Sequence, residues 1–580
     1  MRQEATINRN SITVNFTVKY CNNAESLLDS DGFKRVLTAF IEKIEKKETP
    51  VYIYIKDCCG KNANLVQEIT RLFKMLIVLE ADEIVKLDEK YARLLEDKNT
   101  FIEFIEKLYT FWRRYERYAI VRNSKKGEGL QNVNFIEAIN NFKNLILSTY
   151  RQIEETVMGY KHRVYRQLSA GVNAGIILND MHRVCPAEYS FLERVPFIET
   201  IILQPPFITY PKRNTRTGIF QEVFENPLKD VCINEENWFC YPAKVGESLA
   251  FIYFNRFFMS QGVALCNLFE LAREEEYKNR RPDIIYVYGV KDYETEMKTV
   301  FYDDKENNMM VGYANYGEDI DYFGYMKKMI LTLHNLRMIQ KGGLPIHGAM
   351  VNIIMKNGKK YNIVIMGDSG AGKSESLEAL RNLSEKYVKD MKVIFDDMGT
   401  LLLNPNRDGA PLGVGTEIGA FVRLDDLDTG YAYKEIDRSI FMNPDKKNSR
   451  IIIPIASYSD IMKGYPVDFF FYANNYDEAN DSNELEFFTN PEEAIEVFKA
   501  GRRMAKGTTS EVGIVDSYFA NPFGPVQKQE ETDILIDRFF KEMFVKGTKV
   551  GQIKTQLGIK GMEKDGPMRA AQKLFELIKD

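Results

Sequence analysis

Cysteine is scarce in this chain, and its placement argues against a metal site. Seven cysteines among 580 residues are too few for a dense disulfide framework. They show no metal-ligand spacing, and Cys58 and Cys59 are adjacent rather than separated as in a C-x-x-C site. We therefore expect buried free thiols in a reducing compartment.

Long apolar runs and blocks of one charge are also missing. The longest apolar stretches are shorter than a membrane span, and the opening residues, MRQEATINRN, contain no apolar core of a secretory signal. The net charge of −5 is small for this length, and no basic block offers a surface to a nucleic-acid backbone. These absences predict a cytoplasmic protein that has neither a nucleic acid nor a membrane as partner.

What the chain contains is typical of a globular protein of several domains. Its residues are 44% hydrophobic and 28% charged, and its length exceeds that of a single ordinary core. We expect the α/β class, with mixed α+β character. We predict four segments: a small α/β segment (1–65), a helical domain (66–185), a mixed α/β domain (186–320) and a second α/β domain (321–580).

The amino-terminal part changes character along its length. Strand-like runs at 51–55 and 12–18 lie on either side of a helical stretch at 32–46. From 65 to about 171, apolar residues recur at spacings of three and four while glycine and proline are scarce, which predicts helices. Segment 154–175 is rich in arginine and tyrosine. A charged helix face is the simpler interpretation, and a surface for a partner or effector is the alternative.

The rest of the chain alternates between strand and helix patterns. Strands are expected at 250–253, 283–290 and 308–312, with a helix at 261–274 between the first two. From 321 onward helix, strand, loop and helix follow one another, which predicts an α/β core.

The most informative segment is 361–375, YNIVIMGDSGAGKSE. Its apolar run predicts a buried strand, and the G-x-x-x-x-G-K-S loop after it leads into helix formers. In such a loop glycines turn main-chain N–H groups toward an anion, and the helix N-terminus adds positive charge. Lys373 can reach the outer phosphates, and Ser374 can bind a bridging Mg²⁺. The predicted nucleotide- or polyphosphate-binding residues are Gly367, Asp368, Ser369, Gly370, Ala371, Gly372, Lys373 and Ser374.

Polar residues on both sides of this loop are candidates for its chemistry. A strand at 393–395 is expected to end at Asp396 and Asp397, where a nucleotide-bound metal needs an oxygen ligand, although such pairs are also common in turns. His347 is one of four histidines, and a lone histidine is more often structural. Lys328 opens a helix, where a lysine commonly faces solvent.

The order of these motifs resembles the catalytic half of phosphoenolpyruvate carboxykinase, and is closest to its ATP-using branch. The shared order is Tyr-x-x-x-Met-Lys-Lys (322–328), His-Gly-Ala (347–349), the phosphate loop, Asp-Asp (396–397), Glu417 with Arg423 six residues later, and Asn-x-Arg-x-x-x-Pro-Ile (448–455). The resemblance spans about 283–580. Only the phosphate loop is specific by itself. The HPr kinase/phosphorylase family has a similar histidine, loop and Asp pair.

The resemblance implies decarboxylation of oxaloacetate and phosphoryl transfer to give phosphoenolpyruvate, with ATP or another nucleoside or polyphosphate donor. Lys328, His347 and Asp397 would hold Mn²⁺, and Ser374 would hold the Mg²⁺ of the nucleotide. Lys373 and Arg423 would neutralise the transferring group, Arg450 would bridge it and the acid, and Tyr322 and Ser369 would line the acid pocket. The implied catalytic set is Lys328, His347, Lys373, Asp396, Asp397 and Arg450.

Two departures from the family pattern leave its details open. The family's early Gly-Arg-Ser-Pro-Lys-Asp stretch has no counterpart here, and Arg216 in Asn214-Thr-Arg-Thr-Gly218 is the nearest candidate for the substrate arginine. The adenine-binding Gly-Thr-Glu-Arg is replaced by Gly507-Thr-Thr-Ser-Glu-Val-Gly513, so the base preference stays open.

Three functions follow from these motifs. The first is a carboxykinase-type enzyme. The second is a kinase that uses the same machinery on a protein or small-molecule hydroxyl, as an HPr-kinase-like enzyme would, and the missing Gly-Arg-Ser-Pro stretch favours it. The third is a non-catalytic nucleotide sensor with the helical domain as output, against which the intact Lys373, Ser374 and Asp pair argue.

Overall fold

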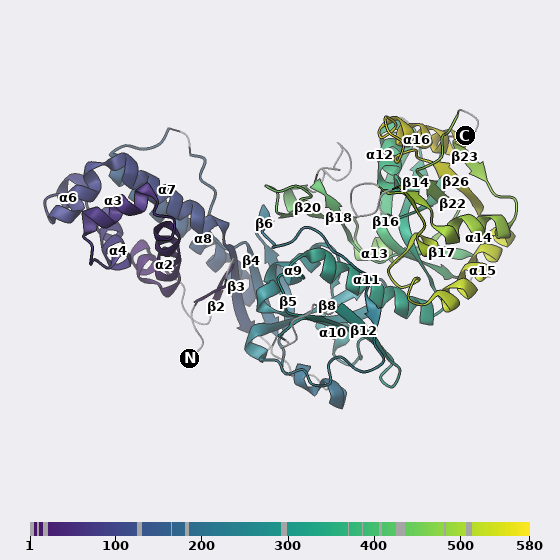
Figure 1. The fold of residues 1–580 in the computed structure, drawn as a ribbon, viewed down its shortest axis with the longest axis horizontal. Coiled ribbons are helices and arrows are strands. Elements are labelled where there is room, and N and C mark those ends of the chain that lie inside the picture. The colour runs from purple at the N-terminus through teal and green to yellow at the C-terminus, as the bar shows by residue number, and fades with distance from the viewer. Residues whose placement is uncertain are drawn as a thin grey trace. The chain divides into compact units, whose positions relative to one another are not determined.

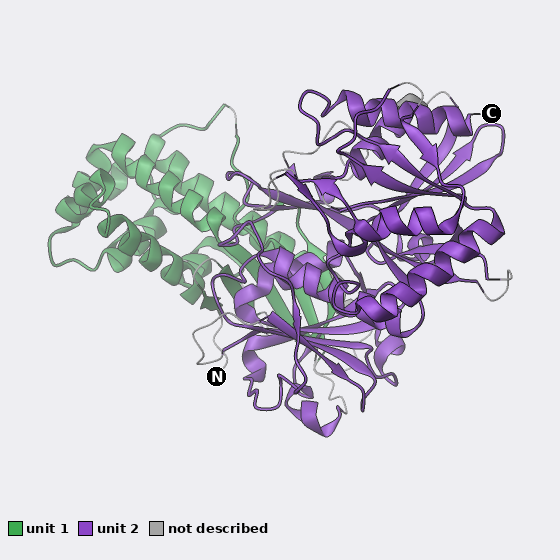
Figure 2. Ribbon diagram, turned by 45° about the vertical axis from the view of Figure 1, so that its right-hand side comes forward, with its two compact units in different colours: residues 1–181, 198–207 green, residues 182–197, 208–580 purple. Residues whose placement is uncertain are grey.

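The computed structural model describes residues 5–8, 11–15, 21–123, 130–163, 165–179, 185–291, 299–368, 370–384, 387–404, 409–424, 436–480, 483–505 and 513–579. The chain forms two compact units, residues 1–181 with 198–207, and residues 182–197 with 208–580 (Figure 2). Helices and mixed sheets confirm the mixed α/β class (Figure 1). The division into four segments stays a prediction. In the described ranges, we find no helix with the length and apolar character to cross a membrane.

The first unit is a helical array next to a group of strands. Its helices are α1 (Ala24–Asp29), α2 (Asp31–Glu45), α3 (Pro50–Cys59), α4 (Leu65–Leu76), α5 (Ala81–Ile84), α6 (Glu89–Glu96), α7 (Lys98–Arg114) and α8 (Leu130–Met158). Its strands follow the order β1 (Ala5–Ile7), β2 (Ser11–Asn15), β3 (Glu116–Asn123), β4 (Ala174–Asn179) and β5 (Phe197–Leu203). The predicted helices at 32–46 and beyond residue 65 are confirmed, with β3 as an interruption.

The predicted strand at 51–55 is wrong, because these residues belong to α3. Pro50 stands at the first helical position, and the Thr49 hydroxyl accepts a hydrogen bond from the Tyr52 N–H at 3.3 Å. Val51 and Ile55, four residues apart, are the buried side of this helix. The apolar run therefore packs one helix face into the helical core.

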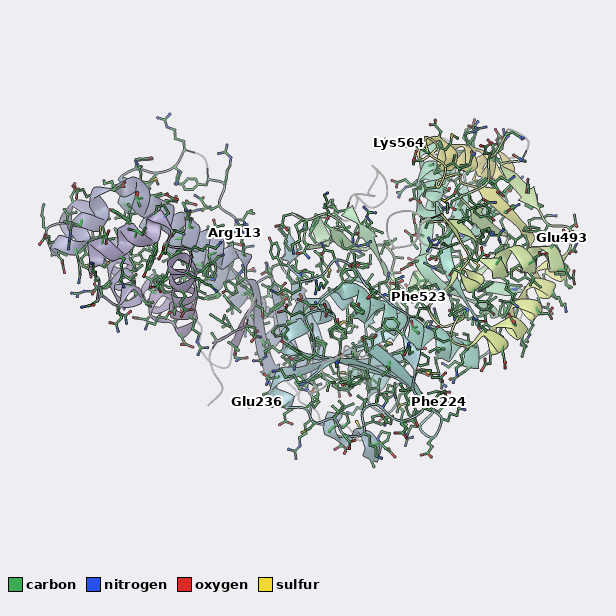
Figure 3. All side chains as sticks on the ribbon, viewed as in Figure 1. Arg113, Phe224, Glu236, Glu493, Phe523 and Lys564 are labelled. Atoms are coloured by element: carbon green, nitrogen blue, oxygen red, sulfur yellow. The ribbon has the colours of Figure 1, made fainter. Side chains whose placement is uncertain are left out.

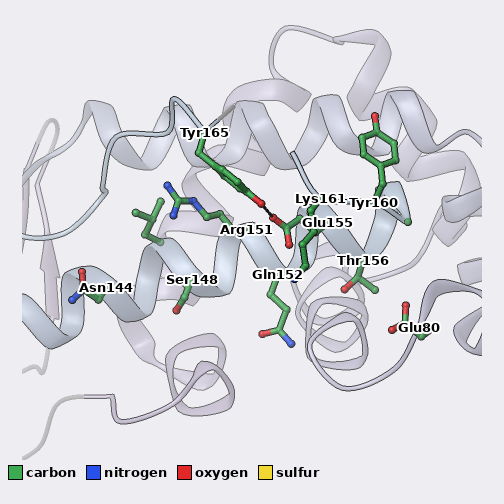
Figure 4. A pocket seen from close by; sticks show the side chains of 12 residues that line it. Glu80, Asn144, Ser148, Arg151, Gln152, Glu155, Thr156, Tyr160, Lys161 and Tyr165 are labelled. Atoms are coloured by element: carbon green, nitrogen blue, oxygen red, sulfur yellow. Dashed lines mark hydrogen bonds between the residues drawn. The ribbon is translucent and has the colours of Figure 1, made fainter. Parts of the chain in front are cut away.

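The predicted helix face at 154–175 is wrong beyond Met158, where α8 ends. Residues 159–163 and 165–173 form neither helix nor strand before β4 begins at Ala174. The Arg151 guanidinium carbon in α8 lies 4.9 Å from the ring centre of Tyr165. Tyr165 donates a hydrogen bond to Glu155, and these side chains line a hollow of about 660 Å³ together with Tyr160 (Figure 4). A partner surface here stays a prediction.

In the second unit, one group of strands follows the order β8 (Trp238–Val245), β9 (Ser248–Asn255), β11 (Ile284–Val290), β13 (Met309–Asn315), β12 (Thr299–Asp304) and β7 (Gln221–Glu222). The predicted strands at 250–253, 283–290 and 308–312 are confirmed. The predicted helix at 261–274 is wrong in its second half, because α9 (Met259–Ala264) is short. The chain after it forms β10 (Glu270–Leu271), which pairs with β8, and α10 (Glu274–Tyr277) follows.

A second sheet of this unit carries the phosphate loop. Its order is β21 (Tyr465–Pro466), β17 (Pro411–Gly415), β16 (Val388–Leu403), β14 (Leu344–Met355), β15 (Lys360–Met366), β22 (Phe469–Asn474), β26 (Lys549–Lys554) and β23 (Leu485–Phe487). The helices around it are α11 (Phe323–Gln340), α12 (Lys373–Ser384), α13 (Tyr458–Ile461), α14 (Pro491–Ala500), α15 (Gln529–Lys546) and α16 (Asp565–Ile578).

Alternation along β15 explains why this sheet has helices on both faces. Ile363 and Ile365 pack with residues of α12 and α16, whereas Val364 and Met366 pack with residues of α14 and α15. A strand buried on both faces reads as a continuous apolar run. The predicted strand before the loop and the helix after it are confirmed.

Candidate functional site

The phosphate loop connects the end of β15 to α12, which begins at Lys373. Gly370 and Gly372 have φ angles of 78° and 90°, which other residues rarely adopt. The Lys373 ammonium donates to the carbonyls of Gly367 and Asp368, at 2.8 and 3.0 Å. The lysine therefore points into its own loop, at the place where phosphate oxygens would compete for it. Ser369 lies outside the described residues.

Ser374 and Asp396 form the oxygen pair that the sequence suggested for a nucleotide-bound Mg²⁺. The Ser374 hydroxyl donates to Asp396 Oδ1 at 2.8 Å. Beside them is a cavity of about 10 Å³, also lined by Leu377 and Arg381, which is close to the space of one water molecule or ion. Hydroxyl and carboxylate oxygens are suitable ligands for Mg²⁺.

The two aspartates do not end a strand, contrary to the prediction. They lie in the middle of β16, which pairs with β14 on one edge and with β17 on the other, so the strand continues past them, with a φ of 148° at Asp397. Successive side chains of a strand point to opposite faces. Asp396 accordingly reaches Ser374 in α12, and Asp397 reaches Lys328 in α11. One dipeptide thus serves both faces of the sheet.

Asp397, whose side chain is 21% exposed, is the centre of a charge cluster whose other members include the buried Lys327 and His347. Its Oδ2 accepts from the ammonium groups of Lys327 at 2.6 Å and Lys328 at 2.7 Å, and its Oδ1 lies 3.0 Å from Nε2 of His347. Lys327 also lies 3.1 Å from an oxygen of Glu417. The structure therefore brings together Lys328, His347 and Asp397, the three residues proposed from the sequence as one site.

The charges in this cluster depend on one another. Burial alone would raise the pKa of Asp397, but the charges of Lys327 and Lys328 lower this pKa well below its usual range. Burial lowers the pKa of Lys328, and Lys327 lowers it further, whereas Asp397 opposes both effects. Burial raises the pKa of Glu417 to about 7. Lys328 is thus the lysine of this pair that gives up its proton more readily.

His347 is held in one orientation by a main-chain carbonyl. Its Nδ1 lies 2.9 Å from the Ala520 oxygen, which can only accept, so Nδ1 carries a hydrogen. Burial lowers the pKa of His347, whereas its hydrogen bond to Asp397 and the charges of Asp397 and Asp368 raise it. Nε2 faces Asp397 Oδ1 at 3.0 Å, where a shared proton, or a metal ion in its place, joins the two atoms. In the part of the chain that the structure describes, no three His, Cys, Asp or Glu side chains gather as a metal site, so a metal here also needs Lys328.

Cationic and aromatic side chains surround the space next to this cluster. The Arg216 guanidinium lies 5.4 Å from the ring centre of Phe523, and the Lys328 ammonium lies 4.5 Å from the same ring. Figure 3 labels Phe523 close to α11, where Asn335 donates to its carbonyl at 2.7 Å. Arg216, the weakest candidate from the sequence, is therefore brought next to the proposed metal ligands.

Arg450 and Tyr322 lie against a second ring, that of Phe421. The Arg450 guanidinium is 5.5 Å from its centre, and the Tyr322 ring is 6.0 Å away. Burial raises the pKa of Tyr322, and the nearby charges of Arg450 and Arg216 act in the opposite direction. The Nε of Arg450 is buried, and it finds no hydrogen-bond acceptor among the described residues. An anion would supply that acceptor.

The segment that carries Arg216 is hydrogen-bonded to the segment that precedes Arg450. Asn443 donates to the Pro211 carbonyl and Asn448 donates to the Asn214 carbonyl, each at 2.8 Å. Strand β20 (Arg450–Pro454) starts directly after this turn and pairs with β18 (Gly419–Arg423) and β19 (Ile440–Met442). Arg450 is the cross-strand neighbour of Arg423, so the three arginines are positioned by connected segments.

Glu417 and Phe523 belong to this site, although no role for either was predicted from the sequence. Glu417 appeared in the motif order, with Arg423 six residues later, and that position was the signal for it. Phe523 belongs to the segment Phe519-Ala-Asn-Pro-Phe523-Gly524, which is also similar to the tail of phosphoenolpyruvate carboxykinase, but the similarity implied no role for this ring.

In comparisons with known proteins, no family model and no curated protein matches the chain. The order of the motifs and the geometry of the site therefore carry the functional argument.

Replacing Asp397 by asparagine is expected to lower the free energy of unfolding by about 3–5 kcal/mol at pH 7, because the partly buried Lys328 loses this carboxylate and the fully buried Lys327 keeps only Glu417 as an acidic partner among the described residues. The pKa of Asp397 is lowered in the folded state, so its contribution is present above the unfolded pKa of about 4 and is lost as the pH falls toward the folded value. Urea unfolding at pH 7 and below pH 4 measures both effects. A difference between wild type and D397N that stays constant over this range would contradict the charge assignment.

Proposed function

We propose that this chain catalyses nucleotide-dependent phosphoryl transfer of the phosphoenolpyruvate carboxykinase type, in which oxaloacetate and a nucleoside triphosphate give phosphoenolpyruvate, CO₂ and a nucleoside diphosphate. The observation that carries the proposal is the convergence of Lys328, His347 and Asp397 beside a phosphate loop. A phosphate loop alone would suit many enzymes. A neighbouring metal-binding set and a cationic pocket are what this reaction requires in addition.

The phosphate loop would bind ATP, or another nucleoside or polyphosphate donor, through its N–H groups and the α12 N-terminus. Lys373 would exchange its two loop carbonyls for phosphate oxygens. Ser374, with Asp396 behind it, would hold the Mg²⁺ of the nucleotide. Arg423 would add positive charge beside the transferring group.

The residues around Asp397 fit a Mn²⁺ ion, because they offer one carboxylate, one imidazole lone pair and one lysine with a lowered pKa. Such an ion would supply positive charge next to the substrate oxygen that receives the phosphoryl group. Lys328, His347 and Asp397 would hold it. Lys327, kept cationic by Asp397 and Glu417, would remain as a fixed charge.

The acid would lie between the two aromatic rings described above. Arg216 and Arg450 would bind its carboxylates, and the buried Nε of Arg450 would gain an acceptor. Tyr322 would contact the acid from the start of α11. Decarboxylation breaks the bond to the departing CO₂ and leaves an electron pair that becomes the enolate, whose oxygen then takes the γ-phosphoryl group. The chain's task is positioning and charge neutralisation, with little need for a base.

The second candidate is an HPr-kinase-like enzyme that phosphorylates a protein or small-molecule hydroxyl. The missing Gly-Arg-Ser-Pro-Lys-Asp stretch favours it, because a hydroxyl acceptor needs no carboxylate-binding arginine there. The hollow beside Tyr165 (Figure 4) would then be a surface for such a partner.

The test is a coupled assay of the purified full chain for oxaloacetate formation from phosphoenolpyruvate and bicarbonate with ADP, GDP or phosphate, in Mg²⁺ and Mn²⁺. Formation of oxaloacetate that depends on one of these acceptors is the expected result. Absence of oxaloacetate-dependent transfer with every donor tested would favour the hydroxyl-kinase reading.

His347→Ala is expected to weaken Mn²⁺ binding to the nucleotide-free protein by at least tenfold, because it removes the imidazole held on Ala520. Titration of Mn²⁺ followed by electron paramagnetic resonance measures this without turnover. His334→Ala is the matched control, since His334 is also fully buried but contacts Ser248 in another part of the unit. Equal Mn²⁺ affinity in both variants would remove His347 from the ligand set.

A further inference from the structure

Two buried side chains donate hydrogen bonds to main-chain carbonyls of the phosphate loop. The Thr555 hydroxyl donates to the Ala371 carbonyl at 2.6 Å, and the Asn475 amide donates to the Gly370 carbonyl at 2.9 Å. Both residues are 0% exposed. They directly follow the parallel strands β26 and β22, so they lie at the same sheet edge as the loop after β15.

Asn475 uses its whole amide for this arrangement. Its second N–H donates to the Met504 carbonyl at 3.0 Å, and its oxygen accepts from the Met504 N–H at 2.8 Å. Its own carbonyl accepts from the Gly558 N–H at 2.9 Å. The residue therefore ties the phosphate loop to β24 (Arg503–Met504) and to the turn after β26.

These contacts fix the direction of the loop's peptide groups. In a trans peptide the C=O and the next N–H point in opposite directions. With the Ala371 oxygen held on Thr555, the N–H of Gly372 must point away from Thr555. Gly372 has a φ of 90°, and an added Cβ would come within 2.7 Å of Thr555. A residue larger than glycine would therefore collide with Thr555 at this position. The hydrogen bond from Thr555 to the Ala371 carbonyl sets the direction of the Gly372 N–H, and anion binding by such a loop depends on that direction.

We propose that Asn475 and Thr555 are positioning residues that hold the phosphate loop in its nucleotide-binding conformation before the nucleotide arrives. Neither side chain touches phosphate; each acts through a carbonyl of the loop. The inference rests on the proposed function, because it presumes that the loop binds a nucleotide. It adds that the affinity of the loop is set partly from β22 and β26.

The decisive variant is Thr555→Val, which keeps the shape of the side chain and removes its donor. We expect Mg²⁺–ATP, or the nucleotide that the wild type binds best, to bind about tenfold more weakly by calorimetric titration. Thr532→Val is the matched control. Thr532 is also 0% exposed and its hydroxyl also donates to a carbonyl at 2.6 Å, that of Lys528 within α15. Thr555→Ser keeps the donor and should restore most of the affinity.

Asn475→Asp is the second variant, because it retains the shape but turns an oxygen toward two carbonyls. It should weaken nucleotide binding more than Thr555→Val does. If Thr555→Val and Asn475→Asp bind nucleotide like the wild type while their melting temperatures fall as that of Thr532→Val does, the pair is merely structural and the inference is overturned. A wild type that binds none of ATP, GTP or polyphosphate would instead overturn the proposed function, and this inference with it.

Discussion

Lys373→Ala is expected to lower turnover at least a thousandfold in a protein that stays folded. The ammonium lies 2.8 and 3.0 Å from two carbonyls of its own loop, so phosphate oxygens can replace both contacts when the nucleotide binds. Without it, charge that builds on the transferring group meets no cation at that position. Turnover in the coupled assay, with circular dichroism and thermal unfolding of the same samples, measures the effect.

A lysine of comparable surroundings serves as control. Lys244 is partly buried, forms an ion pair with Glu276 at 3.0 Å and lies in β8, outside the phosphate-binding sheet. Lys244→Ala should therefore leave turnover within about twofold, since its ion pair serves stability alone. Unchanged turnover in a correctly folded Lys373→Ala protein would remove the central claim, namely that this loop is the site of phosphoryl transfer.

Arg450→Lys is expected to depress phosphoenolpyruvate formation by about a hundredfold or more, which corresponds to roughly 3 kcal/mol of transition-state stabilisation. Lysine keeps the charge but loses the planar fork that can bind two anions at once. The buried Nε, which has no acceptor among the described residues, is the atom that lysine cannot replace. Nucleotide affinity should change little, because the phosphate loop provides most of that binding.

The control for this substitution is Arg280→Lys, at an arginine that pairs with Asp283 at 2.6 Å in another part of the unit. It should leave both turnover and nucleotide affinity unchanged. Joint loss of nucleotide affinity and catalysis in Arg450→Lys would instead identify Arg450 as a clamp for the nucleotide. Arg450 is the cross-strand neighbour of Arg423, which is proposed to lie beside the transferring phosphoryl group. The measurement of nucleotide affinity therefore distinguishes the two roles of Arg450.

The sequence predicted the strand, loop and helix around Lys373 because each part has its own local signal. The strand prediction at 51–55 was wrong because β-branched and aromatic residues favour strands. Thr49 and Pro50, directly before this run, are typical of a helix start. The Asp pair was misplaced for a similar reason. Adjacent aspartates usually mark a turn, and what keeps them within a strand is the pairing of β16 with β14 and β17, which no local pattern reports.

The composition of the site was only partly predictable. Lys327 and Asp397 are 70 residues apart in the chain, and Thr555 is 184 residues from Ala371. Contacts of this range depend on which strands lie next to each other, and one sequence does not contain that information. The resemblance in motif order supplied Lys328, His347 and Asp397 as a set. It gave no indication of Thr555 or Asn475, whose contacts run to main-chain carbonyls.

The placement of Asp396 and Asp397 in mid-strand has a consequence for how this gene can vary in length. Asp396 and Asp397 are themselves paired with Ala349 and Gly348 of β14. Because neighbouring residues of β16 face opposite sides, inserting or deleting a single residue directly before Asp396 would exchange the two carboxylates between α12 and α11. Both proposed metal positions would be lost in one event. Length changes should therefore be tolerated beyond the ends of β16 and be eliminated next to the Asp pair, and deep insertion–deletion scanning would measure this difference.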